Sequence, residues 1–569
     1  MLNKNIENPL AKILYLGVPF IAILVTATIN SDPVNAPKAL VLGTVSFGAL
    51  AIALRFGIKI IWKDSPLALI FSVAFILFAL ISVIFSASPL EQLLYGVGGR
   101  NTGFVTYLGL TFILVGTLPL RNQSNFEKII LGLLFAGVVN FFYNLVVIFG
   151  KDPIPWTNPY MTILGTFGNP NFVSAFMSFF VAICTVFIFD KRKSWTLRIV
   201  LIVFVLVSLF EIKKSNSIQG LIASALGFAV IGYFVLRSHL KGAMISRAYL
   251  LIALFTGIAA IMGMLQKGPL APYLYKRTVS LRGEYWNAGW NMGFSRPFTG
   301  VGIDSYGIWY RELRRASALV NPGPETITNS AHNVFMDIFA GGGFPLMIAY
   351  IGLLALVLVA IIRVTRRTNT YDPIFISLTV GWLCYVAQSM VSINQIGLAV
   401  WGWLFGGALI AYEVGSRREE FFVSEPGIRG GNRNKSSKIQ SNSATPASVT
   451  LVAFIGLVVG TIIACPPAIA DAKWRSALSS GNAEKVMSAL DSWPQDSGRL
   501  AQGANLLAQS NLNEPAYKYA KIGVKFNPRY TDAWKVLGGT PLATEEDKKL
   551  ANENLRLLDS RNPANKLAP

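Results

Sequence analysis

Side chains able to act as a base near neutral pH are scarce, because the chain contains only two histidines. His239 lies among basic residues, and we expect it to be a solvated loop residue. His332 lies in the polar stretch of residues 329–333, shortly before three consecutive glycines at 341–343. A stretch this polar and glycine-rich is unsuited to a lipid-facing turn. We therefore consider His332 a candidate base, with a helix-capping His332–Asn333 pair as the structural alternative.

Cations cluster in the sequence upstream of His332, in a long polar segment at residues 266–331. The segment contains Lys267, Lys276, Arg277, Arg282, Arg296, Arg311, Arg314 and Arg315. Lysine and especially arginine hold a diphosphate through charge-assisted hydrogen bonds, which arginine forms in bidentate pairs. Attraction to anionic lipid headgroups is the alternative explanation for some of these residues.

Two further cationic positions occur at the ends of apolar segments. Arg100 stands in the glycine-rich stretch 98–103, and the pair Lys213–Lys214 comes directly before Ser215. Each is a candidate for anion binding, although snorkelling towards the membrane surface explains a single such residue equally well.

Metal and cofactor chemistry find no support in the sequence. The three cysteines, Cys184, Cys384 and Cys465, have no metal-ligand or CxxC spacing. The chain contains no Asp-x-Asp pair and no P-loop, and the stretch Gly300–Gly302 does not open a strand–helix unit. We expect neither a metal nor a cofactor.

The elements that position these residues are membrane helices. Of the 569 residues, 53% are hydrophobic and only 14% are charged, which excludes an ordinary soluble enzyme. Apolar runs long enough to cross a bilayer recur along the chain, and we expect thirteen spans in an all-α polytopic membrane protein. The runs cover residues 10–30, 37–56, 67–87, 103–120, 126–150, 171–190, 196–212, 217–237, 246–265, 344–363, 373–393, 396–416 and 449–469.

The positive charges that give the net charge of +21 are distributed along the chain in a pattern that indicates the membrane topology. If the N-terminus is cytoplasmic, every inside connection is basic, whereas the short outside loops carry few cations. This pattern argues against nucleic acid as the partner, and it places the N-terminus inside and the C-terminus outside. Segment 266–331 then becomes a large outer loop.

The domain boundaries follow from this topology. Residues 1–416 form the membrane domain, 417–447 a polar cytoplasmic linker, 448–470 the last membrane helix and 471–569 a small extracytoplasmic helical tail. In the tail, Ala516 and Pro528 precede Trp534, Leu537 and Gly538 in a tetratricopeptide-like pattern. A generic helical hairpin is the alternative. Either form suits binding or positioning a partner, such as a protein or a large glycan acceptor, better than chemistry.

Several motifs, taken in order, resemble those of the O-antigen ligase and polymerase superfamily. They are residues 98–103 (GGRNTG), 167–172 (FGNPNF), 217–220 (SIQG), 282–286 (RGEYW), 297–302 (PFTGVG) and 331–333 (AHN). The resemblance implies a C-type glycosyltransferase fold and a metal-independent transfer of a glycan from undecaprenyl diphosphate. It also implies an enzyme that acts at the outer face of the bacterial cytoplasmic membrane.

The same resemblance implies roles for individual residues. His332 would orient or deprotonate the acceptor hydroxyl, with Asn333 beside it, and Arg282 would bind the donor diphosphate. Arg100 is a second candidate for the diphosphate. Family members often carry an arginine near the position of Ile218, which this chain lacks, and Lys214 or its neighbour is our candidate replacement.

Three functions remain open at this point. A ligase would attach the glycan to a lipid or protein, and a polymerase would extend the glycan itself. The third function, from a different class, is a polysaccharide or lipid transporter, which would need ionisable residues or broken helices near the bilayer midplane.

Overall fold

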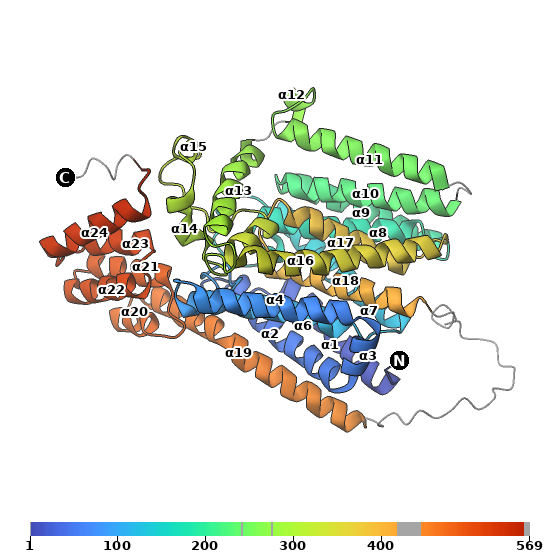
Figure 1. The fold of residues 1–569 in the computed structure, drawn as a ribbon, viewed down its shortest axis with the longest axis horizontal. Coiled ribbons are helices and arrows are strands. Elements are labelled where there is room, and N and C mark those ends of the chain that lie inside the picture. Colours follow the sequence, from blue (N-terminus) through green and yellow to red (C-terminus); the bar gives the residue numbers. More distant parts are fainter. Residues whose placement is uncertain (1, 240–242, 275–276, 418–444, 563–569) are drawn as a thin grey trace.

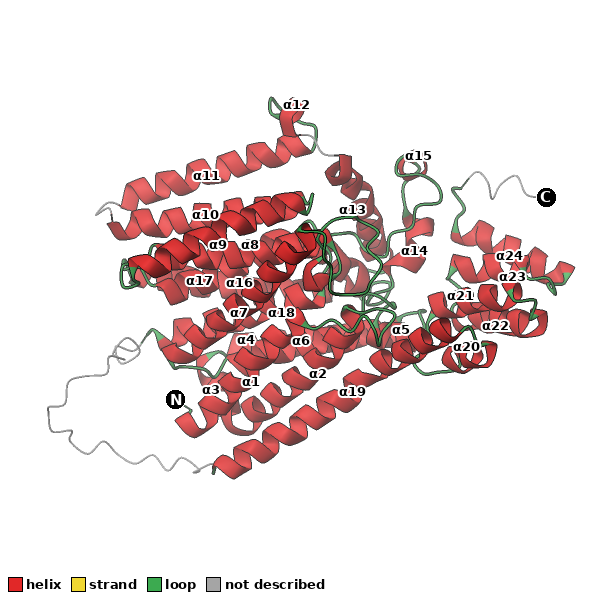
Figure 2. Ribbon diagram, turned by 180° about the vertical axis from the view of Figure 1, so that it is seen from behind, coloured by secondary structure: helices red, strands yellow, loops and turns green. Residues whose placement is uncertain are grey.

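The computed structural model describes residues 2–239, 243–274, 277–417 and 445–562, and every regular element in these ranges is a helix (Figure 2). The predicted all-α class is therefore confirmed for the described residues. Most of the predicted linker, with its basic residues between 418 and 444, lies outside them, as do Lys276 and the side chains of His239 and Arg277.

The helices of the membrane domain follow the predicted apolar runs closely. They are α1 (Lys4–Ile23), α2 (Asn35–Ile52), η1 (Ala53–Gly57), α3 (Ile58–Asp64), α4 (Pro66–Phe85), α5 (Leu90–Tyr95), α6 (Phe104–Thr117), α7 (Gln123–Ile148), η2 (Gly165–Phe167), α8 (Pro170–Ile188), α9 (Trp195–Lys214), α10 (Ile218–His239), α11 (Ala243–Met264), α16 (Val334–Arg367), α17 (Pro373–Ser389), α18 (Ile396–Gly415) and α19 (Pro446–Ser480).

Eleven of the described helical segments are long and apolar enough to cross a membrane. The two remaining predicted spans coincide with shorter apolar helices, α6 and α17, so the count of thirteen stays a prediction. Large apolar side chains project outward along the outer helices, for example Leu251, Phe255 and Ile258 on α11 and Phe454 on α19. An apolar surface of this extent needs lipid around it, and the chain is a multi-pass membrane protein.

Helix α18 lies at the centre of the bundle, and all of its residues are buried. Helices α6, α16 and α17 pack around it, and α8, also largely buried, packs against α9, α10 and α17. The bundle is thus a solid helical scaffold whose polar connections gather at its two ends (Figure 1).

The two ends of the bundle differ in what they carry. The helices of the predicted outer loop and tail lie together at one end, and the N-terminus lies at the other (Figure 1). Segments predicted to lie outside are thus separated from those predicted to lie inside. The direction in which the bundle crosses the membrane remains a prediction from the positive-inside pattern.

Four helices lie within the outer loop rather than an irregular chain: α12 (Ala271–Leu274), α13 (Arg277–Ser295), α14 (Tyr306–Leu313) and α15 (Ser317–Val320). Helix α13 packs along the start of α16, and α14 contacts both α16 and α24 of the tail. The loop therefore bridges the membrane bundle and the tail.

Helix α19 packs closely against α2 because small residues face each other. A side chain on Gly43 would clash with Ala464, and one on Gly460 would clash with the backbone of Gly43. Close approach of this kind stabilises helix pairs within membranes. The last membrane helix was predicted to end at residue 470, but α19 continues to Ser480. Trp474, which lies in this continuation, belongs to the core of the tail. The last span and the tail therefore share one helix.

The tail consists of α20 (Ala483–Leu490), α21 (Ser497–Gln509), α22 (Asn513–Phe526), α23 (Thr531–Gly539) and α24 (Glu545–Leu558). Helix α21 pairs with α22, and α23 pairs with α24. Helix α23 begins 34 residues after α21, which is the tetratricopeptide period. Leu500 and Trp534, one period apart, are both buried in the tail core.

Candidate active site

His332 stands on a short connection that a buried carboxylate holds in place. Asp337 accepts one hydrogen bond from the Ser330 hydroxyl and another from the Ala331 N–H, both at 2.7 Å. The His332 N–H donates in turn to Ser330 Oγ at 2.8 Å. His332 has a φ of +52°, a conformation that a residue with a side chain adopts only when its surroundings impose it. The Asp337–Ser330 pair supplies that constraint.

The imidazole packs against the outer-loop helix α13. Its ring centroid lies 5.7 Å from that of Tyr285, with the planes tilted by 35°. Arg282 is three residues before Tyr285 on the same helix, so the two side chains share one helical face. The backbone oxygen of Tyr285 accepts a hydrogen bond from the Tyr306 hydroxyl at 2.5 Å, which ties α13 to α14.

The electrostatics of this cluster keep the imidazole neutral. Burial, together with the nearby positive charges of Arg282 and Arg100, lowers the pKa of His332 to about 4. Burial also lowers the pKa of Arg282. The structure thus brings together His332, Arg282 and Arg100, three residues that are far apart in the sequence.

Asn333, the fourth predicted site residue, caps helix α16. Its side-chain oxygen accepts hydrogen bonds from the N–H groups of Phe335 and Met336 at 3.0 and 3.2 Å. The capping alternative therefore describes Asn333 well, because that oxygen is occupied. Only the amide N–H groups of the side chain remain for a ligand, and a role for Asn333 in binding stays a prediction.

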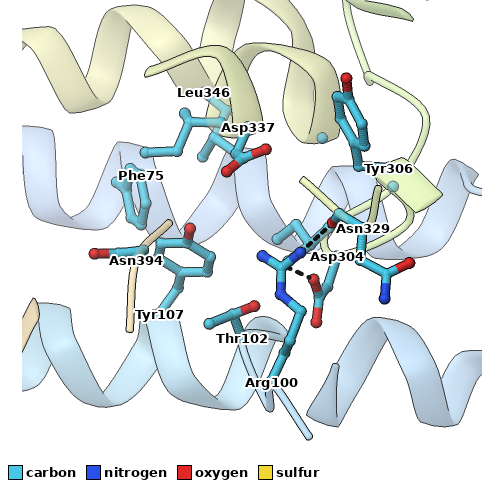
Figure 3. A pocket seen from close by; sticks show the side chains of 14 residues that line it. Phe75, Arg100, Thr102, Tyr107, Asp304, Tyr306, Asn329, Asp337, Leu346 and Asn394 are labelled. Atoms are coloured by element: carbon cyan, nitrogen blue, oxygen red, sulfur yellow. Dashed lines mark hydrogen bonds and ion pairs between the residues drawn. The ribbon is translucent and has the colours of Figure 1, made fainter. Parts of the chain in front are cut away.

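Arg100 reaches the site from the connection between α5 and α6 (Figure 3). Its guanidinium donates to the backbone oxygen of Asn329 and lies 3.7 Å from the Asp304 carboxylate, whereas its buried Nε has no hydrogen-bond partner in the described part of the chain. Asp304 also accepts from the Val97 N–H at 2.9 Å. These contacts hold the 98–103 stretch against residues 304 and 329.

A small cavity lies beside Arg100 and is lined by Thr102, Tyr107, Asp337 and Asn394, among others (Figure 3). Its volume is about 30 Å³, which is room for one or two water molecules. The hydroxyl of Thr102 borders this cavity and is buried without a hydrogen-bond partner among the residues that the structure describes. A cavity that small and that polar is closed around water-sized ligands.

The glycine clusters of the sequence meet at the base of the site. Val301 N–H donates to Ala340 O at 2.8 Å and Gly302 N–H donates to Gly341 O at 3.1 Å. A side chain on Gly300 would lie 2.2 Å from the Gly341 backbone. At Gly343, with a φ of +67°, helix α16 is kinked. Two backbones therefore pack directly on each other, and this contact sets the start of α16 and with it His332.

Three of the other loop arginines are engaged in structural contacts. Arg311 and Arg314 both form ion pairs with Asp559 of the tail, at 2.8 and 2.7 Å. Arg296 lies 5.0 Å from the ring of Trp309. Arg311 and Arg314 are therefore occupied by the tail, whereas a role of the other loop cations in binding a diphosphate stays a prediction. The sequence could not indicate that a tail carboxylate and an aromatic ring are the partners of these three arginines.

Lys214 is not joined to the cluster by any contact found among the described residues. It is exposed at the end of α9, its Nζ lies 5.4 Å from the Phe210 ring, and its backbone oxygen accepts from Thr162. The nearby Gln219 donates to Val391 O at 3.4 Å, and its side-chain oxygen is buried with no partner. The replacement of the missing arginine by Lys214 stays a prediction.

Asp337 and Asp304 are the site residues that sequence reasoning missed. Asp337 lies five residues after His332, the spacing of about one and a half helical turns, and that proximity was a usable signal. Asp304 had none, because its partners Arg100 and Val97 are about two hundred positions away. In the described part of the chain, no group of His, Cys, Asp or Glu residues is arranged to hold a metal ion.

No protein-family model and no curated protein matches this chain. The similarity to the O-antigen ligase and polymerase superfamily accordingly stays an interpretation of the sequence motifs. The geometry of His332, Arg282 and Arg100 is what indicates a function.

Proposed function

We propose that this protein is a metal-independent glycosyltransferase of the ligase or polymerase type. It would transfer a glycan from a polyprenyl diphosphate, of the undecaprenyl kind, to an acceptor hydroxyl at the outer face of a bacterial cytoplasmic membrane. The observation that carries the proposal is the convergence of one neutral imidazole with two guanidinium groups at the end of the bundle.

The proposed glycan transfer needs only His332, Arg282 and Arg100 from the protein. The acceptor oxygen attacks the anomeric carbon of the donor sugar, the bond from that carbon to the phosphate oxygen breaks, and polyprenyl diphosphate leaves with the electron pair. Arg282 and Arg100 stabilise the charge that develops on the departing diphosphate. The proton of the acceptor hydroxyl goes to His332, which is neutral in the resting protein.

Binding of the donor would change the basicity of His332. In the resting protein the two guanidinium groups help to hold the pKa of His332 near 4, which makes the imidazole a weak base. A diphosphate bound between them neutralises that positive field, and the pKa of His332 rises accordingly. Proton transfer therefore becomes favourable only after the donor has bound.

The distribution of buried charge argues against a transporter. Among the described residues, the buried charged side chains of the candidate spans lie near helix ends, as for Glu7, Lys38, Glu211 and Glu413. Transporters place such residues or broken helices near the midplane. The kink at Gly343 is near the end of α16 that carries the site, whereas the π-helical turn η1, which interrupts the span Asn35–Asp64, contains no buried charged residue.

The test is glycan transfer in membranes that contain the protein. We expect His332→Ala and His332→Gln to lose about 10²- to 10⁴-fold in rate, the usual contribution of a general base. The chain's other histidine supplies the control, since His239→Ala should keep wild-type activity. Full activity in His332→Gln, with the protein correctly inserted, would reject the base role.

Arg282→Lys tests the diphosphate role, because a point charge replaces a planar fork. We expect a large loss of transfer that more donor does not fully restore. Arg315, an exposed arginine of the same outer loop, gives the matched control Arg315→Lys. Mass analysis of surface glycoconjugates then separates the acceptor classes. Loss of long chains indicates polymerisation, and unattached carrier-linked chains indicate ligation to lipid or protein.

A further inference from the structure

Two adjoining depressions cross the tail near the candidate site. The first, about 370 Å³ in volume, lies between the outer loop and the tail and shares Asn329 with the Arg100 cavity. The second, an open depression of about 500 Å³ over α21 and α23, shares Gly498, Tyr530 and Asp532 with the first. We call these two depressions together the tail groove.

The floor of the tail groove carries uncharged amide side chains in a row. Gln502, Asn505 and Gln509 are spaced three and four residues apart, so they lie on one face of α21. All three are exposed, and their side chains form no hydrogen bond with any residue that the structure describes. They cover ~10 Å of the helix at 1.5 Å per residue. The row is free to bind a ligand along its length.

The cations of the tail groove are already neutralised. Arg529 pairs with Glu312 and lies against the Trp309 ring, Arg311 pairs with Asp559, and Lys535 pairs with Glu325 at 3.2 Å. A polyanion such as a nucleic acid or a cluster of phospholipid headgroups would have to displace these carboxylates to reach the cations. The groups left over are amides, hydroxyls and carboxylates.

We propose that the tail groove binds an oligosaccharide chain. A sugar hydroxyl both donates and accepts hydrogen bonds, and an amide side chain offers both functions in one group. The exposed part of the Tyr530 ring offers an apolar face next to a polar edge, which suits the mixed surface of a sugar ring. The row on α21 fits several successive sugars rather than a single one.

The groove joins this binding surface to the chemistry. Asn329, which borders both the groove and the Arg100 cavity, is three residues before His332 and accepts the hydrogen bond of Arg100. The end of the groove at Asn329 therefore lies next to the connection that carries His332. This inference rests on the proposed function for its role in the reaction. The bound chain is the glycan of the donor or that of the acceptor, which have the same chemistry.

The test measures binding to the full-length protein in detergent. The probe is oligosaccharide released by mild acid from the host's polyprenyl-linked glycans and labelled with a fluorophore at its reducing end. We expect saturable binding to wild type, weakened about tenfold by Gln502→Ala with Asn505→Ala, because two net hydrogen bonds are lost. Asn552→Ala, an exposed amide on α24 outside the groove, is the matched control.

His332→Ala separates binding from chemistry, since it should bind the probe as wild type does. Competition by the intact carrier-linked glycan would identify the bound chain as the donor's, and competition by acceptor glycan alone would identify it as the acceptor's. Unchanged affinity in the double variant, or displacement of the probe only by peptides, overturns the proposal. Wild-type protein that binds the probe but transfers no glycan would refute the proposed function and leave the groove assignment standing.

Discussion

Asp559 is the most buried of the tail groups that bind the outer loop, and removing its charge should weaken the docking of the tail. Asp559 accepts from both Arg311 and Arg314, and the exposed fractions of the three side chains are 1%, 6% and 0%. We predict that Asp559→Asn destabilises the docked state of the tail. The variant keeps the size of the side chain and removes only its negative charge.

The size of the effect follows from burial. Two guanidinium groups would lose the charge that compensates for their removal from water, and breaking a buried pair in this way costs about 3–5 kcal/mol. Arg314 keeps a hydrogen bond to Pro324 O at 2.8 Å, which places the value towards the lower end. The equilibrium between docked and undocked tail should therefore shift by roughly two to three orders of magnitude.

Hydrogen exchange and pulse proteolysis measure this shift in detergent-solubilised protein. Faster exchange should appear in α14 and α24, which contact each other, while α18 at the centre of the bundle stays protected. Glu545→Gln is the matched control, because the Glu545–Lys548 pair is exposed and contributes at most about 0.5 kcal/mol.

A second variant tests whether an uncompensated buried charge, rather than loss of the contact between tail and loop, causes the effect. The triple substitution Arg311→Met, Arg314→Met and Asp559→Leu removes all three charges together, so no charge is left buried alone. We expect it to recover most of the lost protection. If Asp559→Asn changes exchange in α14 and α24 no more than Glu545→Gln does, then this ion pair does not hold the tail and the reasoning is refuted.

Three further predictions concern the site. His332 has a pKa near 4 in the resting protein, and we expect a higher pKa with donor bound. The value of kcat/KM should therefore fall below about pH 4, and kcat should begin to fall at a higher pH. If both fall at the same pH, this prediction is contradicted. Asp337→Asn should lower kcat roughly 10- to 100-fold in steady-state kinetics with little change in donor KM, since the Ser330 and Ala331 hydrogen bonds position His332. Gly300→Ala should lower the Tm, because its side chain meets the Gly341 backbone at 2.2 Å, whereas Gly257→Ala on α11 meets nothing within 4 Å and should not.

Hydropathy predicted the membrane helices well because the requirement for apolar length is local in sequence. It failed at the end of α19, where the apolar run stops near residue 470 but the helix continues to Ser480. Loss of apolar character marks the membrane boundary, whereas the helix ends only at Gly481, which has a φ of +61° and serves as a C-cap. Hydropathy alone could not distinguish these two positions.

The candidate site was predictable in its cations and base but not in its carboxylates. His332 stood out because histidine is rare in this chain, Arg100 stood out as a charge at the end of an apolar run, and Arg282 was selected by the resemblance of its motif. The partners of a charge are set by tertiary packing, so the sequence could not show that Arg311 and Arg314 meet Asp559, about 250 residues later. Counting cations in a loop therefore overestimated the number available for a substrate.

The cavity beside Arg100 is too small for a diphosphate, and this affects how that guanidinium would bind the donor. The cavity has a volume of about 30 Å³ and Asp304 lies 3.7 Å from Arg100, so we expect a diphosphate bound by Arg100 to displace that carboxylate. The exchange is favourable in charge, since a diphosphate diester carries two negative charges and Asp304 carries one. Asp304 also holds the Val97 N–H, and Arg100 also holds Asn329 O. Displacement therefore loosens the 98–103 stretch and the His332 connection together, so that the base and the donor site are rearranged in one step.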